Sequence, residues 1–77
     1  MHTHPQIILK AINEVLMESG RSERSDVQRS FYLKQDLDLD SLDLAVLTVK
    51  IEAATGIDVF ADGLVETVGQ IVEKLER

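Results

Sequence analysis

The chain of 77 residues is long enough for one small domain and carries a net charge of −6 at pH 7. A domain of this size hides only about 60% of the surface of its unfolded chain, which argues against a deep active-site cavity. The absence of cysteine excludes disulfides, thiolate metal sites and a cysteine nucleophile. No apolar run reaches the length of a membrane span or of a signal-peptide core. We expect one domain over residues 1–77 with a cytoplasmic location.

The acidic charge is concentrated in the second half of the chain. Residues 1–34 hold five basic against four acidic side chains, whereas residues 35–77 hold three basic against ten acidic ones. Such a surface repels nucleic acid and anionic lipid and favours encounters with basic partners, although solubility alone also explains it. We therefore expect no nucleic acid among the partners.

The first predicted helix covers residues 5–16 and ends before Gly20, a natural C-terminal stop. Thr3 and Gln6 resemble a capping box, and His4 is the alternative cap. The apolar side chains recur at helical spacing with polar residues between them. They are Ile8, Ile12, Val15 and Leu16.

A long loop is predicted over residues 20–39, where helical periodicity fails. Only Phe31, Tyr32 and Leu33 offer apolar anchors before the acidic run. Because a connection of this length is uncommon in a compact domain, a short turn of helix near residues 26–30 is a further possibility.

The second predicted helix covers residues 41–55 and ends at Gly56. Asp40 is the favoured N-cap, because Asp43 then occupies the third helical position and suits the first turn of a helix. This assignment leaves the Ser41 hydroxyl free to react.

Two apolar stripes run along this second helix. Either both are buried in a small bundle, or the second, which begins beside Ser41, is partly exposed and contacts partners. The first stripe consists of Leu44, Leu47, Ile51 and Ala54, and the second of Leu42, Ala45, Val46 and Val49.

The C-terminal third predicts two further helices. Residues 57–60 read as an extended linker, residues 61–66 as a short helix, and residues 67–70 as a capping box that opens the last helix. The expected fold is an all-α, small four-helix bundle with a long loop between the first two helices. The core-facing residues of the last helix are Val68, Ile71, Val72 and Leu75.

Metal binding and catalysis by the chain itself are both disfavoured. Asp36, Asp38 and Asp40 resemble the start of a calcium loop, but Ser41 stands where that loop needs glycine and Leu47 where it needs glutamate. The two histidines, His2 and His4, lie near the terminus without a further ligand, and the chain has no other histidine for a catalytic triad. We assign no metal site, no catalytic residue and no role to the histidines.

The segment over residues 37–43, Leu-Asp-Leu-Asp-Ser-Leu-Asp, together with the helices around it, resembles the acyl carrier protein family over nearly the entire chain. The resemblance implies that Ser41 carries a 4′-phosphopantetheine arm, transferred from coenzyme A by a phosphopantetheinyl transferase. It also implies a thioester on the arm, presented to acyl-loading, condensing and acyltransferase enzymes. On this basis we expect a free-standing monomeric carrier of lipid, fatty-acid or polyketide-type biosynthesis, not itself an enzyme.

The chain departs from the family pattern around the motif. Asp38 replaces the glycine common before it, so we expect the approach to Ser41 to be stiffer or differently shaped. Val46 stands where a glutamate is frequent and Lys50 adds a positive charge, which shifts the expected docking toward apolar contact. The partner-binding residues that we expect are Asp40, Leu42, Asp43, Val46, Val49, Lys50 and Glu52.

A competing hypothesis assigns the same surface to a small, unmodified helical interaction module. In that case Leu42, Val46 and Val49 bind a partner helix, and Ser41 merely begins the second helix.

Overall fold

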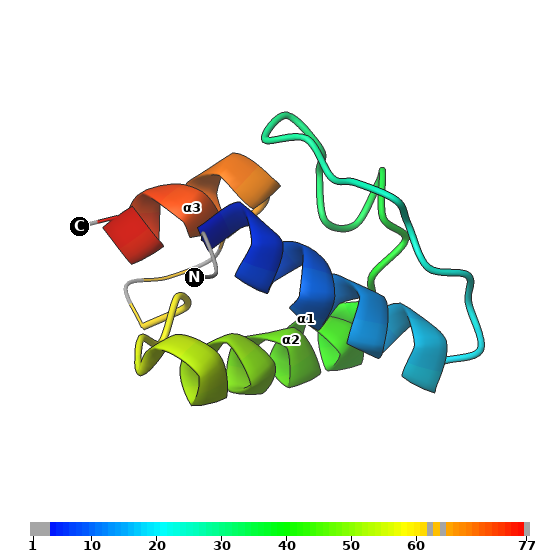
Figure 1. The fold of residues 1–77 in the computed structure, drawn as a ribbon, viewed down its shortest axis with the longest axis horizontal. Helices are drawn as coiled ribbons and strands as arrows, with labels where there is room; N and C mark the ends of the chain where they lie inside the picture. The colour runs from blue at the N-terminus through cyan, green and yellow to red at the C-terminus, as the bar shows by residue number, and fades with distance from the viewer. Residues whose placement is uncertain (1–3, 62, 64, 77) are drawn as a thin grey trace.

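The computed structural model describes residues 4–61, 63 and 65–76, which form a small all-α fold (Figure 1). The helices are α1 (His4–Glu18), α2 (Ser41–Thr55) and α3 (Val68–Glu76). α1 packs against both α2 and α3, whereas α2 and α3 barely touch each other. Within the described ranges, one antiparallel bridge between Tyr32 and Thr67 is the only strand-type pairing.

The first helix forms as predicted, with longer bounds. Its expected apolar stripe is buried in the core. At its end Gly20 takes a left-handed conformation with φ 79°, and the N–H groups of Gly20 and Arg21 donate to the carbonyls of Met17 and Leu16. This double hydrogen bond satisfies carbonyls that the helix end leaves open. The helix begins at His4, and the predicted cap at Thr3 lies outside the described residues.

Both ends of α2 lie where the sequence predicts them. Asp40 is the N-cap in an extended conformation, and Gly56 is the C-cap with φ 77°. The Gly56 N–H donates to the Glu52 carbonyl at 2.7 Å. Of the two stripes, the first is buried through Leu47 and Ile51.

The last helix begins with the predicted capping box. The Thr67 hydroxyl accepts the N–H of Gln70 at 3.2 Å, and the Gln70 side chain accepts the N–H of Thr67 at 3.1 Å. The N–H groups of Val68 and Gly69 donate to carbonyls of the long loop, so the loop also caps α3. All four predicted core residues of this helix are buried.

The long loop over residues 21–40 is held in place along its length. In Figure 1 it leaves the end of α1, passes the start of α3 and returns to α2. The Asn13 side chain of α1 donates to the Arg24 carbonyl and accepts the Arg24 N–H, at 3.0 and 2.8 Å. The expected helical turn near residues 26–30 is only a single turn, closed from Phe31 to Gln28. The buried loop anchors are Leu33, Leu37 and Leu39.

The predicted four-helix bundle is wrong, because the described residues contain three helices, and residues 61, 63, 65 and 66 of the predicted short helix are not helical. Asp58 accepts the N–H of Phe60 on its carboxylate, which starts a local turn. Gly63 has φ 128°, a conformation that no helix contains. The Glu66 carbonyl then accepts the Leu33 N–H of the long loop at 2.8 Å.

Candidate functional site

Ser41 is the first residue of α2 and is exposed. The Asp40 carboxylate accepts the Asp43 N–H at 2.9 Å, and the Asp43 carboxylate accepts the Asp40 N–H at 3.2 Å. This capping box confirms the predicted cap. In the part of the chain that the structure describes, the Ser41 hydroxyl and the N–H groups of Ser41 and Leu42 have no hydrogen-bond partner. A reachable hydroxyl therefore lies beside open donors at a helix N-terminus, where an anion is favoured.

The backbone just before this site takes a left-handed turn at Asp38. Its φ is 58°, and among the described residues it is the only one other than glycine with a positive φ. This is the conformation that glycine adopts freely and that a residue with a Cβ adopts at a cost. The chain thus has a glycine-like backbone at this position without a glycine.

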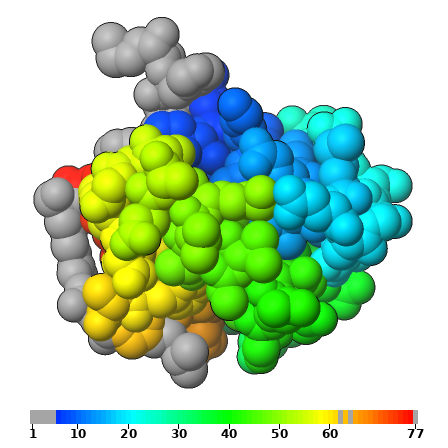
Figure 2. All heavy atoms as spheres, turned by 90° about the horizontal axis from the view of Figure 1, so that it is seen from below, coloured from blue at the N-terminus to red at the C-terminus, as the bar shows by residue number. Residues whose placement is uncertain are grey.

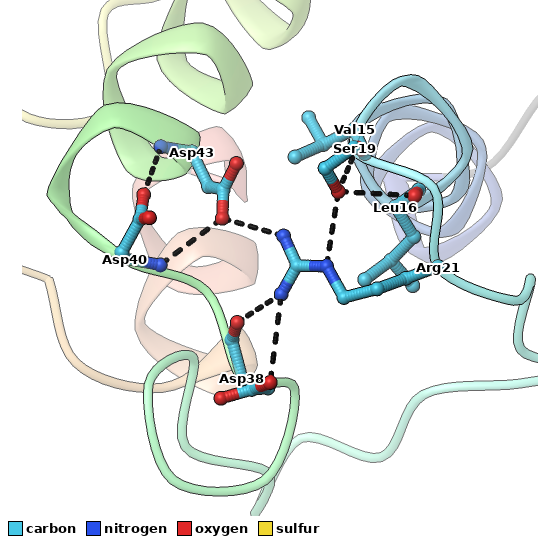
Figure 3. Close-up of polar contacts among 7 residues, drawn as sticks. All are labelled: Val15, Leu16, Ser19, Arg21, Asp38, Asp40 and Asp43. Atoms are coloured by element: carbon cyan, nitrogen blue, oxygen red, sulfur yellow. Dashed lines mark hydrogen bonds and ion pairs between the residues drawn. The ribbon is translucent and has the colours of Figure 1, made fainter.

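Arg21, which follows α1, joins this turn to the capping box (Figure 3). One guanidinium nitrogen donates to the Asp38 carbonyl and lies 3.9 Å from the Asp38 carboxylate. The other donates to Asp43 Oδ2 at 2.5 Å, and Nε donates to Ser19 Oγ at 2.9 Å. The Arg21 side chain is 28% exposed and that of Asp43 is 15% exposed. One cation therefore ties the end of α1 to the start of α2.

These contacts also set the protonation of Asp43. Partial burial raises the pKa of this carboxyl. Hydrogen bonds from the Asp40 N–H and from Arg21, together with the charge of Arg21, lower the pKa by more than burial raises it. The pKa of Asp43 therefore lies below its ordinary value. Asp43 is ionised at neutral pH, and its charge is engaged within the molecule.

An open cleft borders Ser41. Its volume is about 730 Å³, and it is a groove between α2 and the connection over residues 58–66 rather than a closed cavity. Lys34, Gln35, Asp58 and Glu66 add polar groups to its lining. The apolar lining consists of Leu33, Leu44, Ala45, Phe60 and Val65. The length of the chain argued against a deep cavity. The sequence did not predict an open groove.

We compared the chain with protein-family models, with curated proteins and with solved structures. No family model, curated protein or solved structure matches the chain. The resemblance to acyl carrier proteins therefore rests on the residues and their arrangement.

Lys50, which we expect at the docking surface, forms ion pairs with α1. Its Nζ lies 3.2 Å from Glu14 Oε1 and 3.0 Å from Glu18 Oε2, and the lysine side chain is 21% exposed. The hydrogen bonds to Glu18 and Glu14 raise the pKa of Lys50. The positive charge that distinguishes α2 in the sequence is thus neutralised by two glutamates of α1.

The other expected partner-binding residues divide by exposure. Leu42 and Val49 are 73% and 65% exposed, and Glu52 is exposed as well. Val46 is half-buried and packs against the core, and Asp43 is held by Arg21. Figure 2 shows this outer surface of α2 in green, spread across the face of the molecule. The second apolar stripe is thus partly exposed, as one of the two alternatives predicted.

Neither a metal cluster nor a membrane helix occurs in the described residues. No group of three or more histidine, aspartate or glutamate side chains is placed to hold a metal ion there. In the aspartate run, Asp36 instead accepts the Tyr32 N–H at 2.7 Å. No helix within the described ranges is long and apolar enough to cross a membrane.

Sequence reasoning missed Arg21 as part of the site. Its two aspartate partners, Asp38 and Asp43, are 17 and 22 residues away in the sequence, so no local pattern links them to Arg21. The only signal was indirect: an aspartate in a position typical of glycine needs something to hold its backbone.

Proposed function

We propose that this protein is an acyl carrier protein, modified at Ser41 with 4′-phosphopantetheine. The observation that carries the proposal is the exposed, unpartnered Ser41 hydroxyl at the N-terminus of α2, on the border of an apolar cleft of about 730 Å³. A serine that merely capped the helix would use its hydroxyl on the backbone, whereas here Asp40 fills that role.

The residues at the site fit a phosphodiester. The N–H groups of Ser41 and Leu42 have no other partner among the described residues, and the helix dipole favours negative charge at this end. Arg21 compensates the charges of Asp38 and Asp43 nearby. When attached, the arm supplies a thiol that carries an acyl group as a thioester. The chain itself has no thiol, because it has no cysteine.

The apolar cleft suits an aliphatic cargo. Leu44 and Ala45 of α2 form one wall, and Phe60 and Val65 form the other. Removing apolar surface from water lowers the free energy, so an acyl chain placed in this groove is stabilised by contact with these side chains. The cargo class that we propose is therefore a fatty-acid or polyketide-type acyl group.

Partner recognition in this proposal uses the outer face of α2. Leu42 and Val49 provide exposed apolar contact, and Asp40 and Glu52 provide negative charge. The partners are the phosphopantetheinyl transferase and the acyl-loading, condensing and acyltransferase enzymes. The protein itself is not an enzyme in this proposal, and it acts as a monomer in the cytoplasm.

The test is the intact mass of the protein after incubation with coenzyme A, magnesium and a permissive phosphopantetheinyl transferase. We expect a gain of one phosphopantetheine, with the Ser41 hydroxyl displacing 3′,5′-ADP from the coenzyme. Ser41→Ala should abolish the gain, and Ser22→Ala, at an exposed loop serine, should leave it intact. Absence of any gain in the wild type, or a gain that persists in Ser41→Ala, would refute the proposal.

One observation favours a second candidate, an unmodified interaction module. Leu42 and Val49 are large apolar side chains that the fold leaves largely exposed, as on a surface that binds a partner helix. The mass measurement separates the two functions, because only the carrier requires Ser41 to be modified.

A further inference from the structure

Arg21 connects three parts of the molecule that meet beside Ser41. The arginine is anchored at the end of α1, where its N–H donates to the Leu16 carbonyl at 2.7 Å and its Nε to the Ser19 hydroxyl. From there its guanidinium reaches the Asp38 carbonyl and the Asp43 carboxylate. The three side-chain contacts are visible in Figure 3.

The Asp38 contact bears on the backbone that leads into α2. A left-handed residue with a Cβ is disfavoured, so its conformation persists only where neighbouring groups hold it. Here a charged donor binds the Asp38 carbonyl itself, and the buried side chains of Leu37 and Leu39 fix the chain on either side. Arg21 is the only polar side chain in the described residues that binds the Asp38 carbonyl.

The Asp43 contact bears on the helix cap. Asp43 Oδ2 accepts both the Asp40 N–H and Arg21 Nη2, so the arginine and the cap share one oxygen. Ser41 lies between the two capping aspartates in the sequence. Its position is therefore fixed from both sides, by the Asp38 turn before it and by the capping box around it.

We propose that Arg21 is a positioning residue for the modification of Ser41, holding the left-handed turn at Asp38 and the α2 cap so that the hydroxyl faces the transferase. This inference rests on the proposed carrier function. In this chain Arg21 stabilises the left-handed turn at Asp38, and a glycine at position 38 would not need this support. We therefore expect positions 21 and 38 to be energetically coupled.

The experiment compares the kinetics of phosphopantetheine transfer from coenzyme A in five proteins, with modified chain followed by intact mass. They are the wild type, Arg21→Ala, Arg21→Lys, Asp38→Gly and the Arg21→Ala/Asp38→Gly double variant. Arg29→Ala is the matched control, because Arg29 lies in the same loop with a 64% exposed side chain paired to Glu76. Circular dichroism establishes that each variant is folded at the assay temperature.

We expect Arg21→Ala to lower kcat about tenfold or more, because misplacement of a nucleophile costs rate rather than affinity. Arg21→Lys should recover part of this loss, since a lysine keeps the charge but lacks the planar fork that reaches two acceptors. On the Asp38→Gly background the Arg21→Ala loss should shrink to about threefold or less, because glycine adopts the turn without support. Arg29→Ala should match the wild type.

Three outcomes would overturn the inference. Arg21→Ala could be modified as fast as Arg29→Ala, its loss could fall entirely in KM, or the loss could be the same on the wild-type and Asp38→Gly backgrounds. If Arg21→Ala alone is poorly folded, Arg21→Lys carries the test: a kcat lower than that of Arg29→Ala supports the inference, and an equal kcat overturns it. Failure of the wild type to be modified is a separate result, which would refute the carrier function itself.

Discussion

The two connections on either side of α2 are both irregular, but the structure holds them in different ways. The connection over residues 21–40 is tied to α1 by Asn13 and Arg21, to α3 by backbone hydrogen bonds, and to the core by three leucines. In the connection over residues 57–67, Val59 and Val65 are buried in the core, but the described hydrogen bonds of residues 57–63 reach no further than three residues along the chain, and the described bonds to the long loop begin at Glu66. The long connection is thus bound to other segments by hydrogen bonds along its length, whereas among the described residues of the short one such bonds lie at the end next to α3.

The largest expected effect compares one residue from each connection, Leu33 and Phe60, which both line the cleft. Leu33 is fully buried, so Leu33→Ala should lower the free energy of unfolding by about 2–5 kcal/mol. Phe60 is only half-buried, so Phe60→Ala should cost less. Urea denaturation measures both losses. Equal losses would contradict the difference between the two connections.

A smaller effect is expected at the clamp between α1 and the long loop. Asn13→Ala removes two hydrogen bonds to the Arg24 backbone and should cost about 1–2 kcal/mol of unfolding free energy. Asn13→Asp keeps the acceptor and loses the donor, so its loss should be smaller. Hydrogen exchange of the Arg24 amide should rise in the alanine variant. An unchanged exchange rate would show that this side chain does not fix the loop.

The smallest effect is expected from acid titration of Asp43. Because its pKa is lowered on folding, the stability that it contributes is present above its unfolded pKa of 3.8 and is lost as the pH falls through the lower folded value. The melting temperature, followed from pH 7 to pH 2, should therefore fall less steeply below about pH 4 in Asp43→Asn than in the wild type. Parallel curves would show that the link between Arg21 and the cap adds no stability.

Much of the fold was predictable because residues close together in the sequence determine where its helices begin and end. Asp40 is the predicted N-cap of α2, Thr67 and Gln70 form the predicted capping box of α3, and Gly20 and Gly56 end helices in left-handed conformations. Each of these signals depends on residues within a few positions of one another. The free Ser41 hydroxyl followed from the same local reasoning, since assigning the cap to Asp40 released it.

The remainder depended on contacts between distant segments. The fourth helix, expected over residues 61–66, was wrong at its described positions, because Glu66 pairs with the long loop and Gly63 adopts a conformation outside any helix. The ion pairs of Lys50 could not be predicted in the same way, because its partners Glu14 and Glu18 lie on another helix. The link from Arg21 to Asp38 has the same character. A sequence pattern records neighbours along the chain, whereas these outcomes depend on neighbours in space.

The near absence of contact between α2 and α3 has a mechanical consequence. Both helices pack against α1 rather than against each other. The wall of the cleft that faces α2 therefore consists of residues outside any helix. The groove thus has a helix on one side and, in the described residues, irregular backbone on the other. Substitutions at a half-buried lining residue such as Phe60 should therefore change the groove at less cost to the fold than substitutions at Leu33 or Val65, which line the groove and also belong to the core.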